Sequence, residues 1–526
     1  MQQSLSEPEP TPLNIKFAQR LPANILSNAI FFFLNIIVGL ALVPFFLESL
    51  GPAAYGLIPL ATSLTSYVTI IIDAINSAVT RFLTVDLQRS DIQKANETFN
   101  TALLATLGAI IALIPVAIIV AWIAPSIFNI GNESAIEVFL LFAMVFGSVL
   151  VRTWSSNFMV PLFAYNRLDL RNYINIVNVG VQVASVVALF IIIGPSLPFV
   201  GLSYLIAAVI ALLLSTIFSR KVCPFLNISF SYFARSRLRE IGGVTGWIAC
   251  SHLAYLLRYQ VALILVNIMF GEMAGAQYSL VITLSTMLLG LAGLVTSTFT
   301  PMSYSYRAKE DTVGLTKFTL LAMRCTGLAI ALPIALLCIF APQVITLWVG
   351  EEFVGLAPLV WIIIAPMVVR VQASCTDPIF AAYMRVRAPA LFSIAIGILN
   401  VFLAWLFPII FNNGMYGVAY AGSLILLMVG AFFLMYNAYV IQIPLRTFFR
   451  PIVTGAVALS SLLLIGTIYA SFIPIDSIFM LLLSGFLISF AYGIIVLRFI
   501  LKPEERDIIR SCLPSFAVRL IPAWLL

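Results

Sequence analysis

Charged side chains are scarce in this sequence. They make up 9% of its 526 residues, and hydrophobic residues account for 62%. Soluble domains carry about 25% charged residues. This composition excludes a soluble catalytic domain and predicts a membrane protein built from many apolar helices.

Side chains that could form a metal or redox centre are also few. The chain has one histidine and six scattered cysteines, with no CxxC pair. Isolated cysteines are typical of small apolar residues rather than of a zinc or disulfide site. No GxxxxGK[ST] motif occurs, so we do not expect ATP hydrolysis by a P-loop. We therefore expect neither a metal nor a bound cofactor.

Long apolar runs dominate what remains. Each is near or above the roughly 20 residues that a membrane-spanning helix needs, so the sequence predicts an all-α polytopic protein with about 14 spans. The predicted spans are residues 22–47, 56–80, 98–122, 136–163, 173–194, 199–219, 244–269, 277–301, 317–340, 357–382, 391–411, 416–438, 452–473 and 477–500.

Basic residues lie on one side of this span arrangement. All but four of the 28 Lys and Arg fall in the tails and in the loops of one side, and the opposite loops have none. The positive-inside rule then predicts a multi-pass protein of the cytoplasmic membrane with both termini in the cytoplasm. This distribution also explains the net charge of +7 through anionic headgroups, so no nucleic-acid partner is expected.

The two halves of the chain resemble each other at a separation of roughly 220 residues. "PVAIIVAWIAP" (Pro115–Pro125) matches "PIALLCIFAP" (Pro333–Pro342), and "PLFAYNR" (161–167) matches "PIFAAYMR" (378–385). We expect two parallel six-helix repeats, as in transporters whose lobes rock about a central site. The expected parts are an N-terminal tail (1–21), an N-lobe (22–219), a cytoplasmic loop (220–243), a C-lobe (244–438), spans 13–14 (439–500) and a C-terminal tail (501–526).

The four remaining basic residues are arginines inside predicted spans. Arg152 and Arg370 are equivalent in the repeat, and Arg258 is a third near a span centre. Each costs about 2.5–3.5 kcal/mol at a helix centre, so we expect all three to face a water-filled cavity; internal salt-bridge glue is the alternative. Arg324 lies nearer a span end, where its side chain can reach the interface.

Two acids accompany these arginines, Asp73 in the second span and Asp377 in the tenth. Arg370 and Asp377 are seven residues apart, about 10 Å along a straight helix, which is too far for a direct ion pair. The arginines outnumber the acids. Because a guanidinium matches a pair of phosphate oxygens, this surplus predicts an anionic ligand such as a phosphate or an acidic sugar.

Residues 34–83 carry a family resemblance. An apolar span with Pro44 is followed by Leu50-Gly51, by "AYGL" at 54–57, by Asp73 and by "AVTRF" at 78–82. This pattern resembles the start of Wzx-type polysaccharide-transport flippases of the multidrug/oligosaccharidyl-lipid/polysaccharide exporter superfamily.

The resemblance implies transport rather than enzymatic catalysis. Such a protein would flip a polyprenyl-pyrophosphate-linked oligosaccharide from the inner to the outer leaflet by alternating access. Arg152, Arg258 and Arg370 would then form a cationic cavity. Asp73 or Asp377 would couple transport to a proton or Na⁺ gradient, or balance charge. The implied partners are the lipid-linked anionic glycan, membrane lipids and the glycan polymerase or other biosynthetic machinery.

Three alternatives stay open. A drug/cation antiporter of the MATE type belongs to the same superfamily but should line its cavity with acids. A polytopic glycosyltransferase or glycan polymerase usually needs a sizeable outer loop, whereas the predicted outer loops are short. The third alternative is a lipid scramblase without energy coupling.

Overall fold

The protein is helical throughout the part described by the computed structural model. That part comprises residues 12–88, 91–128, 130, 133–165, 167–297, 299–383, 385, 387–473, 477–501 and 506. A bilayer offers no hydrogen-bond partners to the backbone, so an apolar chain of this kind satisfies its amides within helices. The expected all-α class is thereby confirmed.

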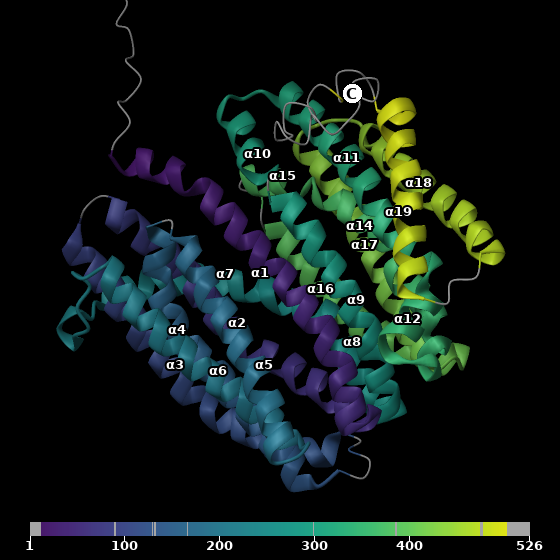
Figure 1. The fold of residues 1–526 in the computed structure, drawn as a ribbon. Coiled ribbons are helices and arrows are strands. Elements are labelled where there is room, and N and C mark those ends of the chain that lie inside the picture. Colours follow the sequence, from purple (N-terminus) through teal and green to yellow (C-terminus); the bar gives the residue numbers. More distant parts are fainter. Residues whose placement is uncertain are drawn as a thin grey trace, which may run out of the picture. The chain divides into compact units, whose positions relative to one another are not determined.

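The helices follow one another with short connections (Figure 1). The first group is α1 (Pro12–Leu50), α2 (Pro52–Gln88), α3 (Ile92–Ile127), α4 (Ala135–Ala164), α5 (Leu168–Ile192), α6 (Leu197–Val222), η1 (Phe230–Tyr232), α7 (Arg235–Tyr259), α8 (Val261–Phe270) and α9 (Glu272–Ser297). The second group is α10 (Phe299–Ala308), α11 (Thr312–Ile339), α12 (Ala341–Val349), η2 (Glu351–Leu356), α13 (Ala357–Ile364), α14 (Met367–Ser374), α15 (Asp377–Ala382), α16 (Arg387–Phe411), α17 (Met415–Val440), α18 (Leu445–Phe472), α19 (Ile478–Ile495) and η3 (Val496–Ile500).

Among the described residues, twelve helices are long and apolar enough to cross a bilayer. A thirteenth span arises if Leu253–Tyr259 and Val261–Phe270, which meet at a bend of 41°, act as one. The predicted second span falls on the 37-residue α2, where the side chains of residues 71–74 lie outside the described part. The protein is thus a multi-pass membrane protein with 12 or 13 described spans.

The chain divides into two compact units. Unit 1 contains residues 1–256 and 266–276, and unit 2 contains residues 257–265 and 277–526. Along the sequence, the chain passes between the two units at residues 256–277, beyond the loop at which the sequence predicted the lobes to separate. The predicted lobe boundaries therefore stay a prediction.

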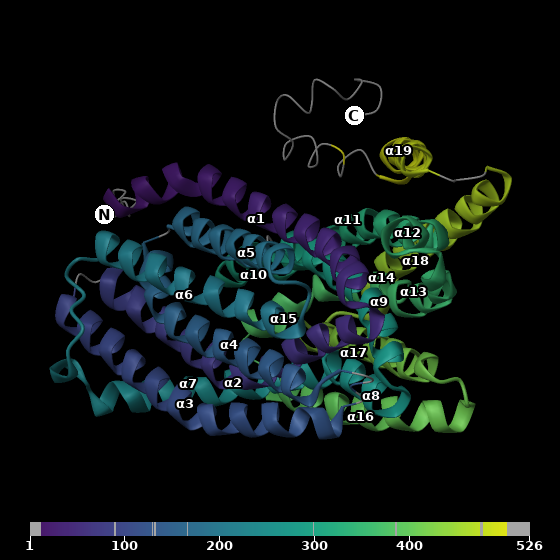
Figure 2. The ribbon, with the colours of Figure 1, turned by 60° about the horizontal axis from the view of Figure 1, so that its bottom comes forward.

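Unit 1 is arranged around α4. This helix packs against α2, α3, α5 and α6, and Figures 1 and 2 both show α3, α4 and α6 side by side. One close approach is at Gly201 of α6, where an added Cβ would lie 2.9 Å from the Cβ of Met144. Small residues allow helices to pack this closely in a bilayer, where apolar burial alone does not drive helix association.

Unit 2 is arranged around the pair α11 and α18, with α14 and α17 packed beside them. The last helix is fastened to this group, because the Tyr492 hydroxyl of α19 donates to the Leu328 carbonyl of α11 at 2.8 Å. The two helices beyond the predicted repeat are therefore integral to unit 2.

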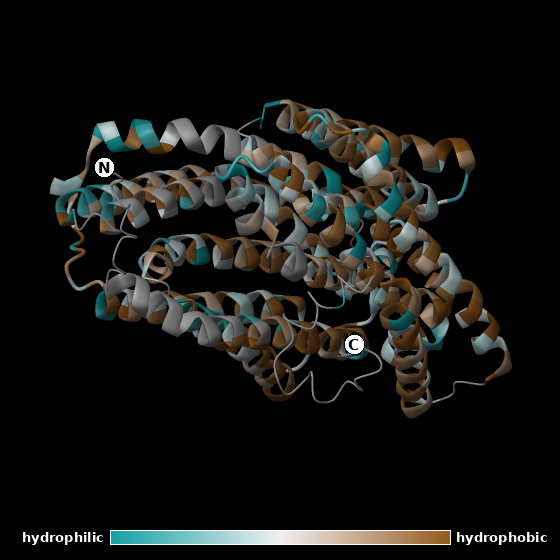
Figure 3. Ribbon diagram, turned by 90° about the horizontal axis from the view of Figure 1, so that it is seen from above, coloured by the Kyte–Doolittle hydropathy of each residue, from teal (hydrophilic) through white to brown (hydrophobic). Residues whose placement is uncertain are grey.

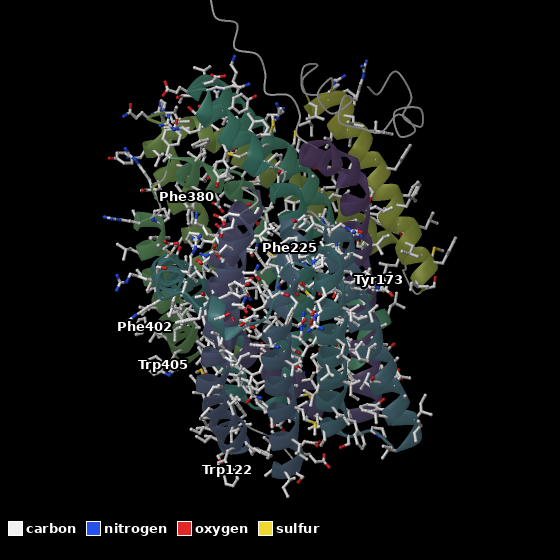
Figure 4. The ribbon with its side chains drawn as sticks, turned by 90° about the vertical axis from the view of Figure 1, so that its left-hand side faces the viewer. Trp122, Tyr173, Phe225, Phe380, Phe402 and Trp405 are labelled. Atoms are coloured by element: carbon white, nitrogen blue, oxygen red, sulfur yellow. The ribbon has the colours of Figure 1, made fainter. Side chains whose placement is uncertain are left out.

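Hydrophobic residues predominate along the helices of both units (Figure 3). Aromatic side chains mark the ends: in Figure 4, Trp122 lies at one end of unit 1, and Tyr173 and Phe225 lie toward the other. Trp122 and Tyr173 are 73% and 51% exposed. Exposed aromatic residues at both ends are typical of a protein that meets two membrane–water interfaces.

Candidate functional site

Unit 1 contains a cavity of about 920 Å³ between α1, α2, α4, α5 and α6. Half of its lining residues carry neutral polar side chains, and two are arginines, Arg152 and Arg171. No acid occurs among the described lining residues. The neutral polar residues are Thr69, Asn76, Thr80, Thr153, Ser155, Ser156, Asn175 and Asn178.

Arg152 reaches this cavity from the middle of α4. It is followed at helical spacing by Ser155, Ser156 and Met159, which line the same wall. Its side chain is exposed to the cavity rather than packed among apolar residues, and Tyr204 of α6 lies close to it. The structure thus places one of the three predicted arginines in a polar, open site.

Arg171 was missed as a site residue by the sequence analysis, which counted it with the basic residues of the cytoplasmic loops. The structure places it in the first turns of α5, on the cavity wall. The signal was present in the sequence: Arg171, Asn175 and Asn178 are spaced at i, i+4 and i+7, which puts three polar side chains on one helix face.

Hydrogen bonds between helices fix the cavity walls. Asn76 of α2 donates to the Ser156 hydroxyl of α4 at 2.7 Å. The hydroxyls of Ser155 and Ser215 join α4 to α6 at 2.8 Å. The Asn76 Oδ1 atom is buried without a hydrogen-bond partner among the described residues, so an acceptor remains beside the cavity.

Asp73 lies on α2 in register with this wall. Residues 69, 73, 76 and 80 follow the i, i+4, i+7, i+11 spacing of one helix face, and three of them line the cavity. The Asp73 side chain itself lies outside the described part of the chain. Its predicted part in coupling or charge balance stays a prediction.

Arg370 and Asp377 form a direct ion pair in unit 2, with Nη2 and Oδ2 2.9 Å apart. The expectation that they lie too far apart was wrong, because it assumed a straight helix. The tenth span breaks between α14 and α15 at Cys375 and Thr376, just before Pro378. The break brings the carboxylate back toward the guanidinium, which also lies over the Phe433 ring at 5.5 Å.

The seventh span is also interrupted, next to Arg258. The α7–α8 bend leaves backbone carbonyls without helical donors, and Asn400 of α16 donates to those of Leu257 and Arg258 at 3.0 and 3.2 Å. Arg258 lines a small pocket of about 80 Å³ and acts electrostatically on Asp377.

The structure thus groups the predicted site residues in two places. Arg258, Arg370 and Asp377 come together in unit 2 beside interrupted helices, a feature that marks binding sites in many transporters. Arg152 lies with Arg171 in unit 1. One cavity shared by all three predicted arginines stays a prediction. Arg324 instead donates to the Ile500 carbonyl near the end of the last span, which fits a structural part.

Known structures share this arrangement of helices. An inward-facing multidrug-resistance MATE family transporter of the MOP superfamily superimposes with a TM-score of 0.65 at 14% identity, covering 78% of this chain and 94% of that one. The lipid II flippase MurJ, in an inward closed conformation, gives a TM-score of 0.62 at 14% identity, covering 92% of this chain and 100% of that one.

The chain has the MATE–MurJ fold. In sequence, it is 29% identical over 490 residues to the uncharacterized membrane protein EpsK of Bacillus subtilis (strain 168), covering 92% of this chain and 96% of EpsK. No protein-family model matches the sequence. This fold is compatible with the predicted exporter superfamily, and both the superfamily and its Wzx-type branch stay predictions.

Proposed function

We propose that this protein is a flippase that moves a polyprenyl-pyrophosphate-linked oligosaccharide from the inner to the outer leaflet by alternating access. The observation that carries the proposal is the unit 1 cavity, where two arginines accompany hydroxyl and amide side chains and the described lining has no acid. Guanidinium groups pair with phosphate oxygens in a bidentate geometry, and hydroxyls and amides suit sugar hydroxyls.

The size of the cavity supports a headgroup of this kind. Its volume of about 920 Å³ lies at the upper end of the roughly 300–1,000 Å³ of small-molecule sites. A diphosphate with its first sugars would fit this space, and the polyprenyl chain would stay in the surrounding lipid. The MurJ structure adds support, because the protein that it shows is named as a lipid II flippase.

Energy coupling is assigned to the acids. In this proposal, protonation of Asp377 would release Arg370 from its ion pair, and Asp73 would respond to a proton or Na⁺ from the cavity side. Both termini would lie in the cytoplasm. The proton or Na⁺ would enter from the outer face.

The main rival proposal is a MATE-type drug/cation antiporter, which the similarity to a MATE transporter supports. Arg152 and Arg171 argue against it, because a cavity lined by two guanidinium groups repels organic cations. The glycosyltransferase alternative has less support, since the similar structures described above are transporters and a flippase.

The test is flipping of a fluorescent polyprenyl-pyrophosphate oligosaccharide in proteoliposomes. Arg152→Gln and Arg171→Gln each remove a charge-assisted contact worth about 1.5–3 kcal/mol, so apparent substrate affinity should fall about 10- to 100-fold. Arg446→Gln, at an exposed position on α18, is the matched control and should flip normally. Unchanged flipping in both cavity variants would contradict the proposal, as would export of organic cations in place of the glycan lipid.

The same assay tests coupling. With an imposed proton or Na⁺ gradient, wild-type flipping should accelerate, and Asp73→Asn or Asp377→Asn should abolish the acceleration while leaving the slow basal rate. If both variants keep the full acceleration, the acids are structural and energy enters elsewhere.

A further inference from the structure

The segment that joins α6 to α7, residues 223–234, is tied to α3 by side chains of that helix. We call it the α6–α7 segment. Asn96 and Asn100 are each 2% exposed, and Thr101 is fully buried. These side chains make five hydrogen bonds to the backbone of the segment. Asn96 donates to Phe225 O (3.1 Å) and accepts from Asn227 N (2.8 Å), and Asn100 donates to Asn227 O (2.8 Å) and accepts from Ser229 N (2.9 Å). Thr101 accepts from Ala234 N (3.1 Å).

These bonds remove the usual obstacle to placing a loop near lipid. Irregular backbone is excluded from apolar surroundings because its amides and carbonyls would lose their partners. In the α6–α7 segment, three buried α3 side chains supply five of those partners. The segment is also held in one shape, so little conformational entropy remains to be lost on binding.

The length and composition of α3 indicate the depth of the attachment points. The 36-residue α3 is about 54 Å long, well beyond the roughly 30 Å of a hydrocarbon core. Its first ten residues, "IQKANETFNT" (92–101), are mostly polar, and its continuous apolar stretch starts at Ala102. We therefore expect the segment bound to residues 96–101 to lie where headgroups meet acyl chains.

The outer surface of the segment combines apolar tips with positive charge. Phe230, Ile228 and Phe233 are 79%, 56% and 43% exposed. Exposed basic side chains flank them on both sides: Arg220, Lys221, Arg235 and Arg239. Residues 220–239 include no acid, and Glu240, which follows, is engaged by Arg237 at 2.9 Å.

We propose that the α6–α7 segment is an interfacial anchor that inserts Phe230 and its apolar neighbours among the acyl chains and binds anionic phospholipid headgroups through the flanking cations. Exposed aromatic residues beside lysine and arginine are suited to this boundary, and each basic residue near an anionic surface strengthens attraction by about fivefold. The anchor would fix the depth and tilt of unit 1, whatever substrate the protein carries.

The test uses the full-length protein with Phe230→Trp in vesicles. The fluorescence of the introduced tryptophan is obtained by subtracting the wild-type signal. We expect quenching by lipids brominated at shallow acyl positions and weak quenching by aqueous acrylamide. Phe233→Trp, at a less exposed neighbouring position, gives a second reading. Acrylamide quenching without lipid quenching at both positions would overturn insertion and indicate a surface that faces water or a soluble protein.

A second experiment tests whether the flanking basic residues bind anionic headgroups. Brominated phosphatidylglycerol should quench the introduced tryptophan at least about twofold more than brominated phosphatidylcholine at low salt. This excess should disappear in Arg235→Gln/Arg239→Gln and persist in Arg446→Gln/Arg450→Gln, which removes the same charge from exposed positions on α18. An excess that is absent in the parent protein, or that survives loss of Arg235 and Arg239, would overturn headgroup binding by this segment.

Discussion

At the scale of single residues, one glutamine joins three helices of unit 2. Gln372 of α14 is fully buried, and its amide donates to Pro451 O of α18 at 2.9 Å and to Met323 O of α11 at 3.4 Å. Its side chain passes between Gly327 of α11 and Gly455 of α18, where an added Cβ would overlap the amide. Two glycines thus make room for one polar bridge.

We predict that Gly455→Ala lowers the free energy of unfolding by about 1–3 kcal/mol through overpacking against Gln372. The double variant Gly455→Ala/Gln372→Ala should lose less than the sum of the two single changes, since the clash is gone. Thermal unfolding in detergent measures both. Gly485→Ala on α19, where a Cβ meets nothing within 4 Å, should be neutral or slightly stabilising. Strictly additive losses of unfolding free energy would show that residue 455 and Gln372 do not interact, and would disprove the bridge.

Single residues also show where reading the sequence succeeds and fails. Arg152 stood out because a charge inside an apolar run is costly, and the structure places it on a polar cavity. Arg171 did not stand out, because it lies just before the predicted span 173–194 and was counted with the basic residues of a cytoplasmic loop. The Gln372 bridge was out of reach, since its partners lie 49 and 79 residues away and nothing local encodes that pairing.

At the scale of elements, α3 begins with a charged cap. Asp91 accepts from the Lys94 backbone amide at 3.1 Å, and its carboxylate pairs with Lys94 Nζ at 2.9 Å. The hydrogen bonds from Lys94 hold the pKa of Asp91 below its ordinary value. A lowered pKa in the folded state means that the stabilisation is present above the unfolded pKa of about 3.9 and is lost as the pH falls through the folded value.

We therefore expect the first turn of α3 to loosen below about pH 4. Hydrogen exchange of the α3 amides in detergent micelles, compared at pH 5 and pH 3 after correction for intrinsic rates, measures this change. Asp91→Asn keeps a capping side chain without a titrating group. The protection of the α3 amides in this variant should therefore change little between pH 5 and pH 3. Equal loss of protection in both proteins would show that another group controls the end of the helix.

The spans themselves were predictable because a bilayer selects for length and apolarity, and each described spanning helix overlaps a predicted one. The break in the tenth span was not predicted. Pro366 and Pro378 were visible, but transmembrane helices tolerate proline when neighbours satisfy the freed backbone groups. Here the buried Asn437 of α17 donates to the Thr376 hydroxyl at 2.9 Å, a partner that only the fold brings near.

At the scale of the whole molecule, the charge pattern makes a topological prediction. Lysine and arginine outside the predicted spans gather on one side, which predicts that both termini lie in the cytoplasm. Green fluorescent protein, which fluoresces only inside the cell, should be bright when fused to either end. Alkaline phosphatase, active only outside, should be active after residue 353 and inactive after residue 309. Opposite behaviour of the two ends would mean an odd number of spans.

The paired proline motifs predict a repeat in the sequence, and the similarity to the MATE and MurJ structures concerns the arrangement of helices. The compact units divide the chain at other residues, because residues 266–276 group with the first unit. The predicted lobes stay a prediction. Sequence similarity between halves records common ancestry, whereas compact units record present contacts, and the two need not share a boundary.

The fastening of the α6–α7 segment also bears on chemical ageing. Asn96 and Asn100 each use the amide nitrogen as a donor and the amide oxygen as an acceptor. Hydrolysis of the side-chain amide, with uptake of water and release of ammonia, would convert either one to aspartate. The aspartate carboxylate accepts but cannot donate, so a buried negative charge would face a backbone carbonyl. Deamidation of one asparagine would therefore weaken the attachment of the α6–α7 segment without any change in chain length. The helical backbone of α3 resists the ring closure that deamidation requires and so protects against it.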